Sequence, residues 1–309
     1  MKKGISDIPF KWIFILIVGA LIIAFFVRFA YQHIETTNKI NTRQMIYNLD
    51  DQLNALSTSQ QSNKYIDIKQ ELNLSCGSLN SLDFKKSTEK IIFSPSTLKN
   101  EKIAAWTLSW EFPFKIANLY YLSNKNIRYL LIYDTTTFNY VKNLQIPQIF
   151  NYQLMDIKNL NQNVLQRSSS TLQQVNLIFF TQPKYITLTG PKVNIVVVNI
   201  TKKDIKINNK HYTYLDEPLL YGAIFAPENY DCLYEKSLAQ LQFISDIYSQ
   251  KAYYLLIKVN NPLCKSKLTI SKNTLDIFKT LNGIILYQYK NQLESQNIEL
   301  LKNDCPSIY

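Results

Sequence analysis

The apolar run WIFILIVGALIIAFFV, residues 12–27, decides how this chain is organised, because its sixteen residues contain no charge. It lies between Lys11 and Arg28. As an α-helix it extends about 24 Å, slightly less than the hydrocarbon core of a bilayer. The two flanking side chains can extend to the lipid surface, so that residues 8–30 are buried in lipid. We therefore predict that residues 1–30 form a short cytoplasmic tip and one transmembrane helix, with membrane lipid as the partner.

A cleaved secretory signal or a buried globular helix fits the run less well. A secretory signal has a shorter apolar core followed by small residues, whereas RFAYQH, residues 28–33, follows this one. A buried globular helix is seldom apolar on every face. Basic residues on both sides of the run barely discriminate its orientation, but the short Met-Lys-Lys start favours a cytoplasmic N-terminus. The location expected is the cell membrane, with a single pass and the C-terminal domain outside the cytoplasm.

Residues 31–64 are predicted to form a helical stalk and a linker. Residues 31–56 contain no Gly or Pro, and four apolar residues in 3-4-3 spacing share one face of a helix. These residues are Ile46, Leu49, Leu53 and Leu56. Two heptads are too few to specify a coiled coil, so this seam either joins copies into an oligomer or docks on the protein's own domain. The polar stretch STSQQSNK, residues 57–64, predicts a linker.

Residues 65–309 are expected to form one extracytoplasmic α/β domain with a Rossmann-like, mixed sheet. Its uninterrupted apolar runs are typical of strands buried on both faces, and a fourth, weaker run lies at 152–157. The three strong runs are 127–133, 175–180 and 193–198. A crossover helix is predicted at 138–144, and a β-hairpin at 205–207 and 212–214.

Further along the chain, helices and one more strand are expected. A helix at 233–248 precedes a strand at 252–259. A second long helix starts near residue 273, although Gly283 weakens it and leaves a strand at 284–289 as the alternative.

The cysteines predict two disulfides, since four lie beyond the apolar run and none before it. A helix from 233 to 250 followed by a returning strand would bring Cys264 near Cys232. Cys76 would then pair with Cys305. Four reduced, buried thiols are the alternative.

The segment AWTLSWEFPFK, residues 105–115, alternates apolar and polar residues, which indicates an extended chain with one apolar face. The aromatic members of that face are Trp106, Trp110, Phe112 and Phe114. They form either a binding platform for sugar rings or a partner protein, or a strand that faces the core, and the second is favoured because aromatic residues dominate cores.

A ligand pocket, if the domain has one, is expected at the carboxyl ends of the strands, where open α/β sheets bind ligands. The residues predicted to line it are Asp134, Thr135, Asp156 and Thr181. The same residue types also begin loops and cap helices, and that use is the more common one.

Catalytic and metal-binding patterns are lacking. The sequence contains no glycine-rich phosphate loop, no G-x-S-x-G elbow and no CxxC pair, and its two histidines are far apart. We expect no metal and no cofactor. The net charge of +11 is spread along the chain, so a nucleic acid is not the expected partner. An interaction or structural role without enzymatic activity is favoured, with a protein or glycan partner outside the cell. An anchored ligand-binding protein or enzyme that uses the strand-end carboxylates is the alternative.

The chain carries two resemblances. Lys2-Lys3-Gly4 ahead of Asp7 and an apolar helix resembles the class III signal of type IV pilin-like proteins, which implies cleavage between Gly4 and Ile5. Lys11 departs from that pattern by interrupting the helix. IPFKWIFILIVGA (8–20), AWTLSWEFPF (105–114) and CPSIY (305–309) are similar to a recurring set of single-pass membrane proteins of small-genome (DPANN-type) archaea. This second resemblance implies a membrane location and no activity.

Overall fold

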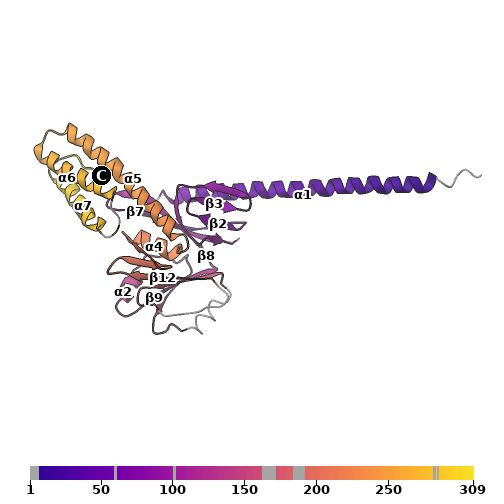
Figure 1. Cartoon of the computed structure of the whole chain (residues 1–309), viewed down its shortest axis with the longest axis horizontal. Helices are drawn as coiled ribbons and strands as arrows, with labels where there is room; N and C mark the ends of the chain where they lie inside the picture. Colours follow the sequence, from indigo (N-terminus) through magenta and orange to yellow (C-terminus); the bar gives the residue numbers. More distant parts are fainter. Residues whose placement is uncertain are drawn as a thin grey trace, which may run out of the picture.

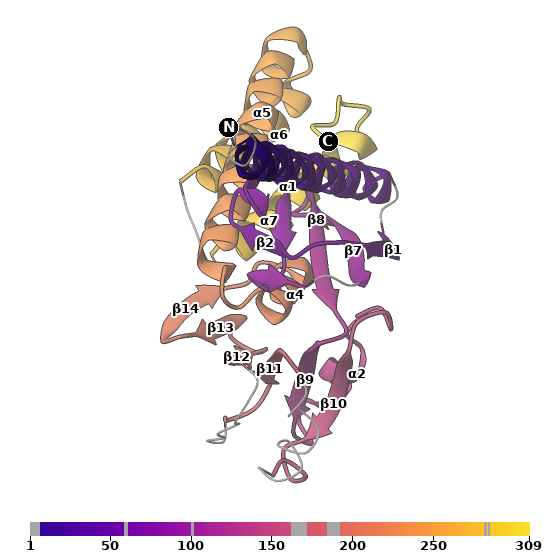
Figure 2. The same ribbon diagram turned by 90° about the vertical axis from the view of Figure 1, so that its right-hand side faces the viewer.

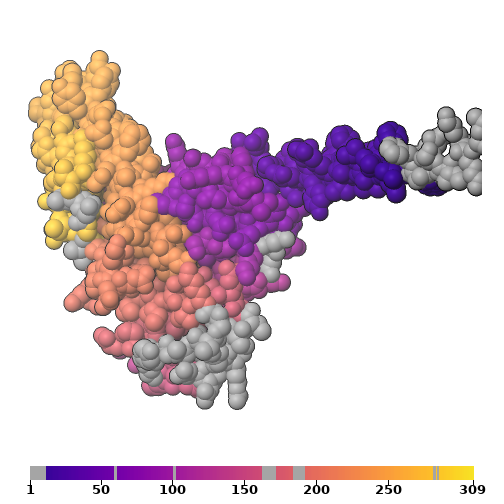
Figure 3. Space-filling view, turned by 45° about the vertical axis from the view of Figure 1, so that its right-hand side comes forward, coloured from indigo at the N-terminus to yellow at the C-terminus, as the bar shows by residue number. Residues whose placement is uncertain are grey.

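The chain begins with one continuous helix, α1 (Asp7–Leu56), of 50 residues. The computed structural model describes residues 7–58, 61–99, 102–161, 172–183, 192–280, 283 and 285–309. The part of α1 from Trp12 onward is long and apolar enough to cross a membrane, and its first half is uncovered. Figure 1 shows this half extending away from the rest of the molecule, and it stands out equally in the space-filling view of Figure 3.

Three sheets and five further helices make up the described part of the domain. The first sheet has the order β1-β7-β8-β5, with β1 (Gln61–Asp67), β7 (Lys102–Glu111), β8 (Lys115–Asn124) and β5 (Ile91–Phe93). The second has the order β4-β3-β2-β6, with β4 (Phe84–Ser87), β3 (Ser78–Ser81), β2 (Leu72–Ser75) and β6 (Thr97–Leu98). Both lie close to the second half of α1 (Figures 1 and 2).

The third sheet is mixed and has the order β10-β9-β11-β12-β13-β14. The strands are β9 (Ile127–Tyr133), β10 (Tyr152–Asp156), β11 (Gln174–Phe179), β12 (Lys192–Asn199), β13 (Asp204–Ile207) and β14 (Lys210–Thr213). The first four are parallel, and β13 and β14 form the predicted hairpin. α2 (Phe138–Lys142) connects β9 to β10, as predicted. The α/β class is therefore confirmed, and the four apolar runs form strands at the expected places.

The seam of α1 docks on the chain's own domain. Ile46, Leu49, Leu53 and Leu56 are at most 6% exposed and belong to the main hydrophobic core. Asp50, on the same part of α1, makes ion pairs with Lys86 and Lys90. Of the two alternatives for the seam, this is the second, so these four residues are not free to join a second copy.

The first strand of the domain begins inside the stretch predicted as a linker. β1 starts at Gln61 and pairs with β7 over seven residues, so a break between residues 64 and 65 would cut a paired strand. The polar residues of the predicted linker alternate between exposed and half-buried positions, which is the pattern of an edge strand.

The C-terminal helices form an arm beside the sheets (Figure 1). α4 (Glu217–Phe225) packs on β5, β7 and β8, and α5 (Tyr230–Lys258) then runs out to meet α6 (Pro262–Phe278) and α7 (Leu286–Lys302). The single long helix predicted from residue 273 is therefore wrong. Two helices meet there around Gly283, whose φ of 86° suits glycine and interrupts a helix.

The predicted disulfide pairing is also wrong. The bridges join Cys76 to Cys232 and Cys264 to Cys305, with Cα–Cα distances of 5.9 and 5.6 Å. No strand forms at 252–259, because α5 continues through these residues to a length of 29 residues. A helix of that length extends about 43 Å, so it carries Cys264 far from Cys232.

Candidate functional site

The strand-end residues lie along one edge of the third sheet, because β9, β10 and β11 are parallel. Asp134 follows β9, Asp156 ends β10 opposite Tyr133, and Thr181 follows β11. The Thr181 hydroxyl is close enough to the Asp134 carboxylate to lower the pKa of Asp134. That these residues line a ligand pocket stays a prediction.

The Asp134 carboxylate is already engaged within the chain. It accepts hydrogen bonds from the backbone N–H and the hydroxyl of both Thr136 and Thr137. The Thr136 hydroxyl, followed by that of Thr181, is the main cause that lowers the pKa of Asp134 well below its ordinary value. Asp134 therefore closes the turn that leads into α2.

Asp156 and Thr135, at the same edge of the sheet, line none of the cavities described below. Asp156 accepts a hydrogen bond from the Lys158 backbone N–H at 2.8 Å, and Thr135 is exposed. The cavities found in the described parts of the chain, of about 220 to 730 Å³, are lined by other residues. The described residues also contain no group of three His, Cys, Asp or Glu side chains that could hold a metal ion.

The aromatic face predicted at 105–115 is buried. Trp106, Trp110 and Phe112 are 0% exposed and Phe114 is 2% exposed, so they offer no platform to a sugar ring or a partner. The alternative, a strand that faces the core, is what the structure shows. Trp106 contacts the rings of Tyr121 and Tyr221 at centroid distances of 4.7 and 5.1 Å.

The same segment joins the sheets to the helical arm. Phe112 packs edge-on against Tyr287, and Phe114 packs against Tyr248 and Tyr309 at 4.6 and 5.7 Å. Trp106 lies in the body of the first sheet, whereas Phe112 and Phe114 reach α5, α7 and the C-terminus. One alternating segment therefore anchors two parts of the core.

Replacing Trp106 by alanine should lower the free energy of unfolding by about 4 kcal/mol, because the indole fills a space that its neighbours cannot close. The measurement is chemical denaturation of the purified full-length chain. Tyr65→Ala is the matched control, since Tyr65 is 57% exposed and lies on the neighbouring strand β1. Equal losses in the two variants would contradict the buried position of Trp106.

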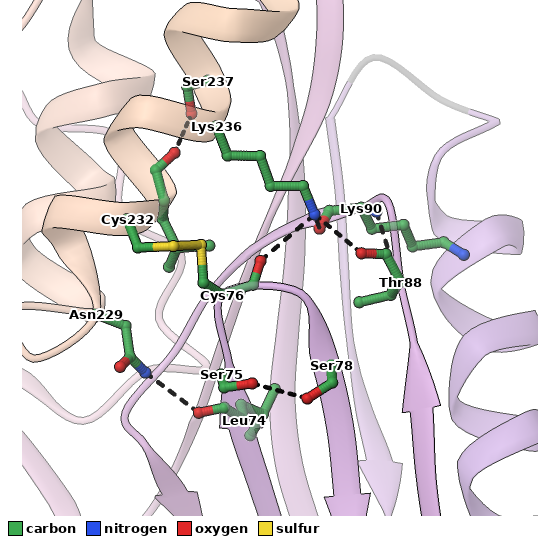
Figure 4. The surroundings of a disulfide bond; sticks show 11 residues. Leu74, Ser75, Cys76, Ser78, Thr88, Lys90, Asn229, Cys232, Lys236 and Ser237 are labelled. Carbon is green, nitrogen blue, oxygen red and sulfur yellow. Dashed lines mark hydrogen bonds between the residues drawn. A yellow bond between two sulfur atoms is a disulfide. The ribbon is translucent and has the colours of Figure 1, made fainter.

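Lys236 is a structural residue that the sequence did not indicate. It follows Cys232 by one turn of α5, on the same face (Figure 4). Its ammonium group donates to the backbone carbonyls of Cys76, Thr88 and Lys90 at 3.4, 2.9 and 3.0 Å. Burial lowers the pKa of Lys236. The disulfide and the ammonium together attach α5 to the strands beside α1.

Lys236→Met should destabilise the domain by about 2 kcal/mol, because methionine keeps the apolar stem but leaves three carbonyls without their donor. Thermal melting under oxidising conditions is the measurement. Lys265→Met, at an exposed position of α6, is the control and should have the same melting temperature as the wild type. If Lys236→Met also melts with the wild type, the three hydrogen bonds contribute nothing to stability.

A polar cluster between the second and third sheets was also missed. Glu228 accepts from Asn194 at 3.0 Å and from Ser96, and it pairs with Lys192. Burial would raise the pKa of Glu228, but these hydrogen bonds outweigh it and lower the pKa. The stretch APENYDC, residues 226–232, gave only the signal of a helix start.

A cavity of about 720 Å³ lies where α1 leaves the domain. Its walls are α1 residues 35–44 and the turn between β3 and β4. In that turn Leu82 is 69% exposed and has a φ of 47°, a backbone conformation that is rare for a bulky residue. Arg43 lies over the ring of Phe84 at 5.2 Å. This hollow lies beside the exposed half of α1.

Comparison with protein-family models, with curated proteins and with solved structures finds no match for this chain.

Proposed function

We propose that this protein is a single-pass membrane protein whose extracytoplasmic domain acts as an interaction or structural module. The observation that carries the proposal is the uncovered first half of α1. From Trp12 to Phe29, thirteen large apolar side chains are 49 to 69% exposed. Leaving them in water would cost on the order of 15 kcal/mol, as much as the whole stability of an ordinary domain. Lipid is the apolar environment that such a helix fits.

The two disulfides indicate on which side of the membrane the domain lies. All four cysteines lie beyond the apolar segment and are paired. Stable disulfides belong to oxidising compartments, whereas the cytoplasm keeps thiols reduced. A cytoplasmic N-terminus and an extracytoplasmic domain in the cell membrane are consistent with this pairing.

Carbonate extraction of membranes tests the anchor. The full-length chain should stay in the membrane pellet, and protease added outside the cell should digest the domain. A variant with charged residues in the apolar run, Ile17→Asp with Ile22→Lys, is the control and should be released. Full-length wild type in the carbonate supernatant would overturn the proposal.

A pilin-like subunit is a second candidate, favoured by one observation. α1 is a single helix whose apolar first half is free and whose second half packs on sheets, so it could join neighbouring subunits through the first half. The bond between Gly4 and Ile5 lies outside the described residues. N-terminal sequencing of the mature protein tests this candidate: a start at Ile5 supports it, and an intact Met1 rejects it.

A Rossmann-like classification of the third sheet is proposed from its strand order. Counted from β9, the four parallel strands have the order 2-1-3-4, as in doubly wound sheets. The order reverses between β9 and β11, where Asp134 and Thr181 meet. Ligand binding at this point is the remaining alternative. Titration of wild type and of Asp134→Asn with a candidate ligand tests it, and weaker binding by the variant would support it.

A further inference from the structure

The outer face of α5 carries an apolar stripe that no described part of the chain covers. Phe243, Ile247, Tyr254 and Ile257 are 61, 46, 60 and 63% exposed. α6 packs on another side of α5, and α7 packs on α6 (Figures 1 and 2). Side chains at α5 positions that face inward, such as Leu241 and Ala252, are buried. The stripe is therefore a second face of this helix and not part of its core.

The stripe has the spacing of a coiled-coil seam. In heptad notation Gln240, Ile247 and Tyr254 take the a positions, and Phe243, Gln250 and Ile257 take the d positions. Four of the six a and d positions from 240 to 257 carry exposed apolar side chains, and the other two are glutamine. This short seam fits one partner helix, and the charges and the area below argue for which helix that is. We propose that α5 pairs with α5 of a second copy of this chain, in parallel and in register.

The charges beside the seam favour this partner and this direction. Asp246 and Tyr253 take the g positions, and Lys251 and Lys258 take the e positions. In a parallel pair, g of one helix meets e of the other five residues later, so Asp246 meets Lys251 twice and forms the one pair of opposite charges. Within the chain the Lys251 ammonium also donates to the Ile308 carbonyl at 2.7 Å. Antiparallel helices bring e to e and g to g, which does not form the pair of Asp246 with Lys251. Within the chain Asp246 pairs with Lys279 at 2.6 Å, and its side chain remains 44% exposed.

The area is enough for a weak dimer. The four apolar side chains and Tyr253, about half exposed, would bury on the order of 500 Å² per copy, or about 1,000 Å² in all, which is the lower limit for a specific interface. Confinement of both copies to one membrane raises their effective concentration, as a linker does. The inference thus rests on the proposed anchoring and names a second copy as the partner.

Cross-linking of the full-length chain in its membrane tests the dimer. Gln250→Cys and Phe243→Cys each place a thiol at a d position, and both should give a covalent dimer with a short bismaleimide, which leaves the native disulfides intact. Thr269→Cys, an exposed position of α6, should stay monomeric. Adding Ile247→Glu to Gln250→Cys should reduce the dimer about tenfold, because two carboxylates then face each other across the axis.

The outcomes are distinct. Dimer at both d positions and its loss with Ile247→Glu support the inference. Dimer at Gln250→Cys alone overturns the parallel register, and no dimer above the Thr269→Cys level overturns the pairing itself. Carbonate extraction of the same samples shows whether the anchor holds, so a failed dimer and a failed anchor cannot be confused.

Discussion

Alanine in place of both Cys76 and Cys232 is expected to lower the free energy of unfolding by about 5 kcal/mol. The bridge closes a loop with a sequence separation of 156 residues. A loop of this length restricts the unfolded chain strongly, and the chain-entropy relation converts that restriction into the value above. Because a domain of this kind is stable by only about 5–15 kcal/mol, the variant should lie close to its unfolding transition at room temperature.

The second bridge provides the matched comparison. Cys264 and Cys305 close a loop with a separation of 41 residues, so alanine at both should cost about 4 kcal/mol. Chemical denaturation of the two double variants and of the wild type measures which variant loses more free energy of unfolding. A larger loss for the Cys264 and Cys305 variant would contradict the dependence on loop length, and peptide mapping without reduction would show whether the pairing itself differs.

Leu53→Asp is expected to cost a similar amount, about 5 kcal/mol, through a cavity and a buried charge without a partner. Leu53 is 0% exposed, in the seam that joins α1 to the sheets. The second half of α1 should then detach from the domain. Trypsin should cut the detached stalk after Lys39 or Arg43 in the variant sooner than in wild type, and denaturation should give the loss in stability.

Asn54→Asp is the control for that experiment. It adds the same charge at the next residue of α1, on an exposed position. Its stability and its cleavage rate should match wild type. If the two variants behave alike, the docking of α1 on the domain is refuted.

The strands of the third sheet were predictable because their pattern is local. IRYLLIY (127–133) is a continuous apolar run, and the structure forms β9 over the same residues. The strands of the second sheet were not predicted. LNLS, SLNS and FKKS (72–75, 78–81 and 84–87) are short and polar, and only pairing with one another and packing beside α1 makes them strands.

For the strand-end residues and the aromatic face, too, the sequence predicted one part and the tertiary structure decided the other. Parallel strands place Asp134 and Thr181 at one edge, which followed from the order of runs and turns. Whether that edge is hollow depends on side chains far apart in the sequence. An alternating aromatic segment has one apolar face in any environment, but whether that face meets solvent or Tyr221 depends on the position of α4.

The sequence by itself determined the apolar helix at the start of the chain, the α/β class and the even set of cysteines, because each depends on composition or on spacing along one stretch. Only the tertiary structure decided which cysteines pair, what the α1 seam packs against and which face of α5 stays free. Each of these depends on packing between elements that are far apart in the sequence. The 29 residues of α5, where the pattern predicted a helix only over 233–248, carry Cys264 away from Cys232 and next to Cys305.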